Sequence, residues 1–417
     1  MAGSTRIAPH RNRWLRILGV SFIMYVLSYI DRTNIAMATP AMRAELGISA
    51  SVFGFATGMF FWGYIVLQIP AGRLASVWSA KWVIFCLLLV WSVVSFSTAY
   101  VRTENELIAN RFILGIFEGG VLTCTIVLIR KWFTRPERAR ANTTFLISIP
   151  IAQVIANPIS GLVLAHFNWQ MMFIVEALPG ILWAGVWAWA ITEEPRDAKW
   201  LDPAEKARIV AALAAENAAV TPVQGHWIRT LWHPAVILLA LYNFAALAAE
   251  WGVTFWLPTV LKETGLSITT VGFLAAIPPA LGAVMMILVA ISSDRLQERK
   301  WHMIVCTALS GICLLLAQLA GHGSTIGILI FLTLAVATFT GRFGPFWSLP
   351  TEVLPPAVAG VGIGLINGAG NLGGTVGPYF FGTVRDLTGS FTLALTIGGI
   401  SLIIGSLIAT PIRQRKN

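Results

Sequence analysis

The sequence has few charged residues and few cysteines. Asp, Glu, Lys and Arg make up 12% of the 417 residues, about half of the ~25% that is usual in soluble domains. The cysteines form neither a CxxC pair nor a metal-binding spacing; they are Cys86, Cys124, Cys306 and Cys313. No nucleophile–base set, cofactor-binding loop or cluster of metal ligands is present, so we expect neither an enzyme nor a bound cofactor or metal.

Long apolar runs account for most of the chain. Hydrophobic residues make up 56% of it, and windows of about 20 residues with few or no charges recur, the length needed to cross a bilayer. The runs are continuous and do not alternate, which favours helices over a β-barrel. We therefore predict an all-α polytopic membrane protein with twelve spans, at about residues 15–38, 51–72, 82–100, 105–129, 141–166, 169–191, 233–260, 268–292, 302–320, 325–349, 357–381 and 389–411.

The basic residues are unequally divided between the two sides of these spans. If the N-terminus is cytoplasmic, most of the 29 Lys and Arg residues fall in cytoplasmic segments. Such a bias marks the cytoplasmic side of membrane proteins. It places both termini in the cytoplasm and explains the net charge of +10 without nucleic acid. The outer loops hold only Arg43, Arg102, Lys262 and Arg385.

A polar segment at residues 192–232 divides the spans into six and six. Within it, Asp202 followed by Pro203 is typical of the start of a helix, so we expect a short cytoplasmic helix here. The similar loops GRLASVWSAKW and SSDRLQERKW each follow the second span of their half, which indicates two pseudo-symmetric bundles. The predicted division is a cytoplasmic tail at 1–14, a six-helix bundle at 15–191, a central loop at 192–232, a second bundle at 233–411 and a tail at 412–417.

An ordered series of longer motifs runs through residues 20–390: YIDRTNIAMA, WFTRPERARANTTFL, NWQMMFIVEALPG, FWLPTVLK, GPFWSLPTEVLP and GLINGAGNLGGTVGPYFFG. In these motifs the sequence resembles the anion:cation symporter branch of the major facilitator superfamily. The resemblance implies a fold of two six-helix bundles and proton-coupled uptake of a small organic anion. Sugar acids, tartrate, phthalate and hydroxyphenylacetate are the substrates of such transporters.

Ionisable side chains inside the spans are costly, so each is either paired or functional. Arg32 is the strongest candidate for binding an anion, because its planar guanidinium fits a carboxylate and stays charged. Tyr29 lies three residues earlier, near the same helix face. In the resembled family, the matching tyrosine and arginine contact substrate. The alternative is an ion pair that only orients helices. The in-span ionisable residues are Asp31, Arg32, Arg111, Glu118, Glu176, Glu250 and Arg342.

Three of these residues are candidates for proton coupling. Desolvation favours the neutral form of Glu118, so this carboxyl could load and release a proton. The resemblance implies that Asp31 and Glu118 form the proton-coupling pair. Asp31 and Arg32 are neighbours on a helix and must face different directions. We expect Arg111, seven residues before Glu118, to pair with one of the two acids.

Arg342 and Glu250 depart from the family pattern. Arg342 could bind a second carboxylate of the substrate, or it could form an ion pair with Glu250 between spans 7 and 10. The sequence is compatible with both the carboxylate site and the ion pair. The resemblance further places Tyr64, Asn367 and Trp347 on the substrate cavity. Two further lining candidates are Asn371, four residues after Asn367, and Gln153.

The loop after span 2 lacks the acid that is usual in the superfamily and has Ser76 in its place. The corresponding loop of the second half keeps Asp294 with Arg295, which we take as gating residues. We therefore predict a resting population shifted toward the inward-open state.

The leading function is import of an organic anion by proton symport across a bacterial inner membrane. One alternative is a proton-driven exporter of the same fold, which the fragment IANPISG weakly suggests. Another is a transporter-like sensor that binds solute without moving it. The expected partners are a small carboxylate, protons and membrane lipid, without nucleic acid, and the protein is expected to act as a monomer.

Overall fold

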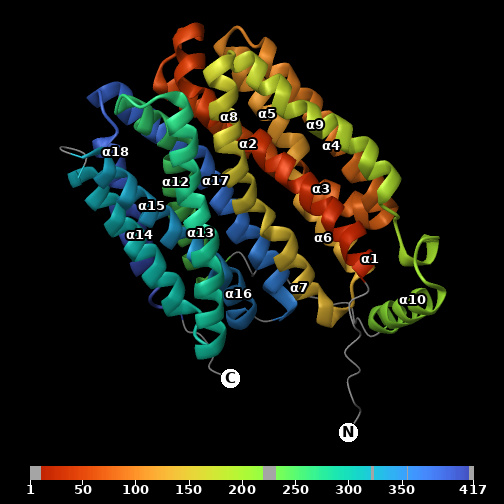
Figure 1. The fold of residues 1–417 in the computed structure, drawn as a ribbon. Helices are drawn as coiled ribbons and strands as arrows, with labels where there is room; N and C mark the ends of the chain where they lie inside the picture. The colour runs from red at the N-terminus through yellow and green to blue at the C-terminus, as the bar shows by residue number, and fades with distance from the viewer. Residues whose placement is uncertain (1–10, 219–231, 321–323, 355, 413–417) are drawn as a thin grey trace.

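The computed structural model describes residues 11–218, 232–320, 324–354 and 356–412 (Figure 1). All regular structure in these ranges is helical. The two predicted tails lie largely outside the described residues, as does the part of the central loop at 219–231.

The first half of the chain folds into six spans. α1 (Arg11–Arg13) and a turn of wider helix (Trp14–Gly19) lead into the first of them. Two of the spans are each built from two consecutive helices. The spans are α2 (Val20–Leu46), α3 (Ala50–Leu74), α4 (Ala80–Ser97), α5 (Glu104–Gly119) with α6 (Val121–Trp132), α7 (Arg135–Leu146) with α8 (Ser148–His166), and α9 (Trp169–Ala190).

The second half repeats this plan. Its fourth span is again built from two helices, α15 and α16. The spans are α12 (Pro234–Glu263), α13 (Ile268–Leu296), α14 (Lys300–Ala320), α15 (Thr325–Gly341) with α16 (Phe343–Val353), α17 (Pro356–Thr388) and α18 (Thr392–Ile408).

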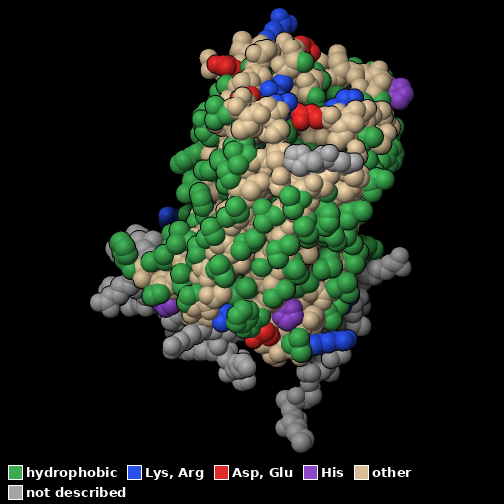
Figure 2. Space-filling view, turned by 90° about the vertical axis from the view of Figure 1, so that its left-hand side faces the viewer, with side chains coloured by type: hydrophobic (Ala, Val, Ile, Leu, Met, Phe, Trp, Pro, Cys, Tyr) green, Lys and Arg blue, Asp and Glu red, His purple; other side chains and the backbone are tan. Residues whose placement is uncertain are grey.

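These helices confirm the predicted all-α membrane fold of two six-helix bundles. Within the described ranges, nine helical stretches are long and apolar enough to cross a membrane, and one of them combines α3 with α4. The outer surface agrees with this, because hydrophobic side chains cover the middle of the face in Figure 2 and charged side chains gather toward its two ends. A surface of this kind is suited to lipid rather than to water.

The predicted helix between the bundles is present as α10 (Pro203–Ala218). Asp202 caps it, as expected, because its Oδ1 accepts hydrogen bonds from the N–H groups of Ala204 and Glu205 at 3.0 and 3.1 Å. α10 lies beside α1 at one end of the molecule, which we call the α10 end (Figure 1). The other end carries the turn between α2 and α3, where Gly47 has a positive φ of 66°; we call it the Gly47 end.

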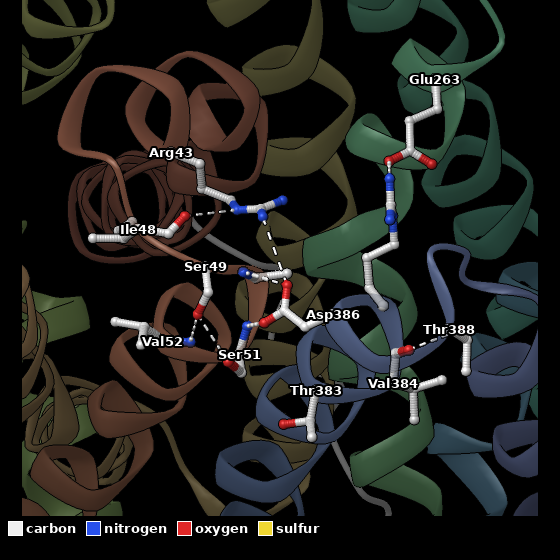
Figure 3. A network of polar contacts seen from close by, with 12 residues as sticks. Arg43, Ile48, Ser49, Ser51, Val52, Glu263, Thr383, Val384, Asp386 and Thr388 are labelled. Carbon is white, nitrogen blue, oxygen red and sulfur yellow. Dashed lines mark hydrogen bonds and ion pairs between the residues drawn. The ribbon is translucent and has the colours of Figure 1, made fainter.

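The two halves meet most tightly toward the Gly47 end. α3 packs along α17, and α8 packs along α13. A Cβ atom at Gly54 or Gly58 of α3 would collide with the backbone oxygen of Pro378 or Thr375 in α17. Asp386, at the end of α17, also accepts hydrogen bonds from the start of α3 (Figure 3). The structure is therefore closed at the Gly47 end.

Candidate functional site

The centre of the first half contains a buried ion pair between α2 and α5. Nη2 of Arg32 lies 3.0 Å from Oε2 of Glu118, and Nε of Arg32 donates to the same oxygen at 3.2 Å. The hydroxyl of Ser28, one turn before Arg32, donates to this oxygen as well. The second oxygen of Glu118, Oε1, is buried and has no hydrogen-bond partner. Arg32 and Glu118 are thus joined, but one carboxylate oxygen is left unused.

Three aromatic rings surround the guanidinium of Arg32. Its Cζ lies 4.5 Å from the ring centre of Tyr29, 5.0 Å from that of Phe60 and 4.9 Å from that of Tyr64. Rings at this distance attract a cation through their negative faces. The structure therefore brings Tyr29 to Arg32, as its spacing on the helix predicts, and it brings Tyr64, which was expected to line the cavity, to the same guanidinium. Phe60 was missed, although it lies one helical turn before Tyr64 and so shares its face.

Asp31 points away from this group toward α4. The hydroxyl of Ser95 donates to its Oδ1 at 2.6 Å, and the indole N–H of Trp91 donates to its Oδ2 at 3.2 Å. The two neighbours on α2 thus face different helices, as their spacing of about 100° requires. Asp31 is buried but not ion-paired, so it is a second carboxyl inside the bundle that is held only by neutral donors.

The predicted ion pair of Arg111 is absent from this structure. Nη2 of Arg111 donates instead to the backbone oxygen of Arg32 at 3.2 Å, and its Nε and Nη1 have no partner. The reason is that Arg32 already engages Glu118 while Asp31 faces α4. Arg111 is wholly buried, so its unused N–H groups are donors held close to the pair of Arg32 and Glu118.

Span 4 and span 10 are both interrupted beside a charged residue. In span 4, α5 ends at Gly119, directly after Glu118, and α6 begins at Val121. In span 10, Arg342 itself is the residue between α15 and α16. In both spans the linking residue, Gly120 or Arg342, keeps right-handed helical backbone angles, so each junction is a local irregularity in a continuous span. The sequence motifs did not reveal these two interruptions.

Arg342 is fully buried and has no counter-ion within ion-pair distance. Its Cζ lies over the rings of Phe339, Phe343, Phe346 and Tyr242, between 4.2 and 5.4 Å from their centres. The alternative of an Arg342–Glu250 ion pair is wrong for this state, because Oε2 of Glu250 and all three guanidinium nitrogens lack hydrogen-bond partners.

The other predicted lining residues do not gather in one place. Gln153 lines a small central cavity with Thr33 and Asn157 of the first half and with Thr254 of the second. Asn371 is buried and its amide nitrogen is unpartnered. Asn367 and Trp347 are half-buried, and Trp347 packs on Phe346 with ring centres 4.8 Å apart. None of these side chains contacts Arg32 directly in this closed arrangement.

The predicted gating residues lie at the α10 end of the second half. Asp294 forms an ion pair with Arg299, which also pairs with Glu352 at 3.2 Å, so the loop after span 8 is tied to the end of α16. Arg295 is exposed. In the first half, the hydroxyl of Ser76 donates to the backbone oxygen of Gly72 within its own helix.

The loop after span 2, which contains Ser76, is held by an acid that the sequence motifs did not indicate. Glu193, just after α9, accepts hydrogen bonds from the N–H groups of Ala80 and Lys81 at the start of α4 and forms an ion pair with Lys131. Burial would raise the pKa of Glu193, but these donors outweigh it and hold the pKa below its usual range. Glu193 therefore stays ionised and caps α4.

Comparison with known proteins decides the family. The family model for the Major Facilitator Superfamily matches residues 21–378. The chain belongs to the major facilitator superfamily. This superfamily consists of transporters, so the expectation that the protein is not an enzyme is confirmed.

Individual relatives cover almost the full chain. A protein of Agrobacterium vitis named "Putative tartrate transporter" is 34% identical over 95% of this chain and 92% of its own length. The "Quinolone resistance transporter" of Acinetobacter baumannii is 29% identical over 94% and 92%. Among solved structures, the xylose transporter XylE from E. coli in an inward open conformation matches with a TM-score of 0.79 at 16% identity, over 96% and 97% of the two chains. This last likeness shows the fold.

Proposed function

We propose that this major facilitator protein is a proton-coupled symporter that imports a small organic anion. The observation that carries the proposal is the buried ion pair of Arg32 and Glu118, with Nη2 of Arg32 3.0 Å from Oε2 of Glu118. Three aromatic rings surround its guanidinium. A guanidinium held there is a ready binding group for a carboxylate. The tartrate-related name of one relative points to the same class of substrate.

The geometry supports a direct coupling of substrate to proton. A substrate carboxylate that binds the Nε–Nη2 edge of Arg32 displaces Glu118, because Glu118 uses the N–H donors of that edge. Once displaced, Glu118 would be a buried carboxylate without a counter-ion, and desolvation then favours its neutral form. The unpartnered Oε1 is the atom that would accept the proton. Substrate and proton therefore bind together, and loss of the proton restores the original pair.

Asp31 and Arg111 support this exchange from either side. Asp31 provides a second carboxyl, held by Ser95 and Trp91. Arg111 has two guanidinium nitrogens without a hydrogen-bond partner near Glu118, and these donors can hold the carboxylate of Glu118 after it loses its proton and before it returns to Arg32. We assign Gln153, which lines the small cavity, and Asn367, Asn371 and Trp347 to the neutral part of the substrate site.

We further propose that the α10 end faces the cytoplasm of a bacterium and that the membrane is its inner membrane. The unequal distribution of Lys and Arg supports this orientation, and the relatives are bacterial proteins. Closure at the Gly47 end then corresponds to an inward-facing state.

The test is transport by the purified protein in liposomes. A pH gradient, acid outside, should drive accumulation of a labelled carboxylate from a panel of aldonates, aldarates and tartrate. Glu118→Gln should abolish this accumulation and spare exchange between substrate on the two sides. Loss of both activities in a folded variant would contradict a coupling role for Glu118.

Export is the second candidate, because one relative of similar identity is named for quinolone resistance. Under export, an acid-outside gradient would expel a quinolone from the liposomes and would not drive carboxylate uptake. Arg32 favours an anionic substrate over a cationic drug in either direction of transport, so the direction of the proton-driven flux decides between the two candidates.

A further inference from the structure

The junction in span 10 places an unpaired cation near the position that corresponds to Glu118 in span 4. Arg342 joins α15 to α16, and Gly341, Gly344 and Pro345 flank it. The glycines widen the range of backbone conformations open to this junction, and the proline removes one backbone N–H donor from α16. In span 4, Glu118 stands directly before the corresponding junction, which is marked by Gly119 and Gly120.

The surroundings of Arg342 repeat those of Arg32, except for the acid. Both guanidinium groups lie over aromatic rings, three around Arg32 and four around Arg342. Arg32 has Glu118 at 3.0 Å. All three nitrogens of Arg342 lack a hydrogen-bond partner, although the side chain is wholly buried. A buried charge without a partner is costly, so it is usually kept for a ligand.

α12 runs between the two arginine sites. The ring of its Tyr242 packs on the guanidinium of Arg342 at 5.4 Å, and Glu250 follows about two helical turns later. The next residue, Trp251, packs across the boundary onto Phe61 with ring centres 4.9 Å apart, and Phe61 packs on Phe60 beneath Arg32. This turn of α12 therefore lies against the Arg32 site. The buried Oε2 of Glu250 has no donor.

We propose that Arg342 is a second anion subsite, which makes the protein specific for a substrate with two negative groups. This inference rests on the proposed function, in which Arg32 binds the first carboxylate. The substrate class is a hydroxylated dicarboxylate of four to six carbons. Arg342 binds its second carboxylate after the junction of α15 and α16 moves the covering rings aside. An ionised Glu250 on the neighbouring α12 would oppose the binding of this second carboxylate.

The experiment compares acids that differ only in the second carboxylate. Tartrate is matched with threonate, and galactarate with galactonate. Binding to the purified full-length protein is measured by calorimetry at pH 6 for the wild type and for Arg342→Gln. The wild type should bind each dicarboxylate roughly ten- to a hundredfold more tightly than the matched monocarboxylate. This difference is the one expected from hydrogen bonds to a charged group. Arg342→Gln should lose this preference and keep the affinity for the monocarboxylate.

Two further variants keep the test decisive. Glu250→Gln removes the competing negative charge and should tighten binding of the dicarboxylates while leaving binding of the monocarboxylates unchanged. This result would support the subsite even if Arg342→Gln did not fold. Arg102→Gln changes an exposed arginine of the first half and should leave all four affinities unchanged.

Failure of the inference can be told apart from failure of the proposed function. Equal losses for both members of a pair in Arg342→Gln would overturn the subsite and leave the anion site at Arg32 intact. A wild type that binds threonate as tightly as tartrate would do the same. If Arg32→Gln kept full affinity for the monocarboxylates, the proposed role of Arg32 would be wrong whatever Arg342 does.

Discussion

Asp386 of the second half caps the first helical turn of α3, which belongs to the first half. Its Oδ2 accepts a hydrogen bond from the N–H of Ser51 at 2.7 Å, and its Oδ1 accepts one from Ala50 at 3.0 Å (Figure 3). Arg43 approaches the same carboxylate at 3.9 Å. A carboxylate is stabilised at the N-terminus of a helix. Because this cap joins the two halves, it is present only while the Gly47 end is closed.

Substituting Asp386→Asn should therefore favour opening of the Gly47 end. The amide can still accept hydrogen bonds, but the charge is lost, and that charge is worth about 0.3–1 kcal/mol. A roughly two- to fivefold shift in population should follow. It can be measured as a longer distance between spin labels on cysteines at Glu104 and Ser267, both exposed at this end.

The matched control for this variant is Glu263→Gln. Glu263 pairs with Arg385 at 3.0 Å, but both residues belong to the second half. The control should leave the label distance unchanged. Equal shifts in the two variants would show that the effect comes from general loss of charge.

The same cap should respond to pH at the Gly47 end. Burial would raise the pKa of Asp386, but the hydrogen bonds from Ser51 and Ala50 and the charge of Arg43 outweigh it and lower the pKa. Residue 386 lies beyond the predicted span, which ends at 381. A lowered pKa means that the cap is fully present above the usual aspartate range, near pH 4, and is lost as the pH falls through the lowered value.

Closure measured by the spin labels should thus persist down to about pH 4 and weaken only below it. Asp386→Asn should remove this acid dependence. An opening of the wild type between pH 5 and 7 would mean that another group controls this end.

The spans, the different directions of Asp31 and Arg32, and the closeness of Tyr29 to Arg32 followed from sequence because they depend on local rules. Apolar length sets a span, and residues three or four apart share a helix face. The partner of Glu118 did not follow. Its choice between Arg32 and Arg111 depends on how α2 and α5 are rotated against each other, which no local pattern specifies.

The same limit applies to Arg342 and Glu250. Both were recognised as unusual charges inside spans, yet the sequence could not show that each would lack a partner in the closed state. The cap at Asp386 was also missed. It is formed between residues 335 positions apart, and an aspartate near the end of a span gives no sign of its acceptor role.

Arg32→Lys should separate charge from geometry at the proposed substrate site. Lysine keeps the positive charge but cannot present two parallel N–H donors, and its compact ammonium is poorly matched to the three rings. We expect carboxylate affinity to fall about tenfold while the fold is retained. Calorimetric titration against the best acid of the panel measures this, and unchanged melting of the ligand-free protein is the control. Unchanged affinity would show that Arg32 acts only as a point charge.

Gly58 tests the close packing between α3 and α17. A Cβ at this position would collide with the backbone oxygen of Thr375 in the other half, and such overpacking costs about 1–3 kcal/mol. Because the colliding atom belongs to the opposite half, the halves can relieve the collision by separating, and each bundle keeps its own packing. Gly58→Ala should therefore lengthen the distance between labels at Glu104 and Ser267. The melting temperature of the protein, followed by its helical signal, should fall by no more than a few degrees.

Gly185→Ala is the control, since no atom lies within 4 Å of a Cβ at that position of α9. It should leave both measurements unchanged. If Gly58→Ala left the label distance as in the wild type but sharply reduced stability, α3 and α17 would have to be packed against each other in every state of the transport cycle. The closed Gly47 end would then be a fixed part of the fold, and access to Arg32 from that side would require a different pair of helices to separate.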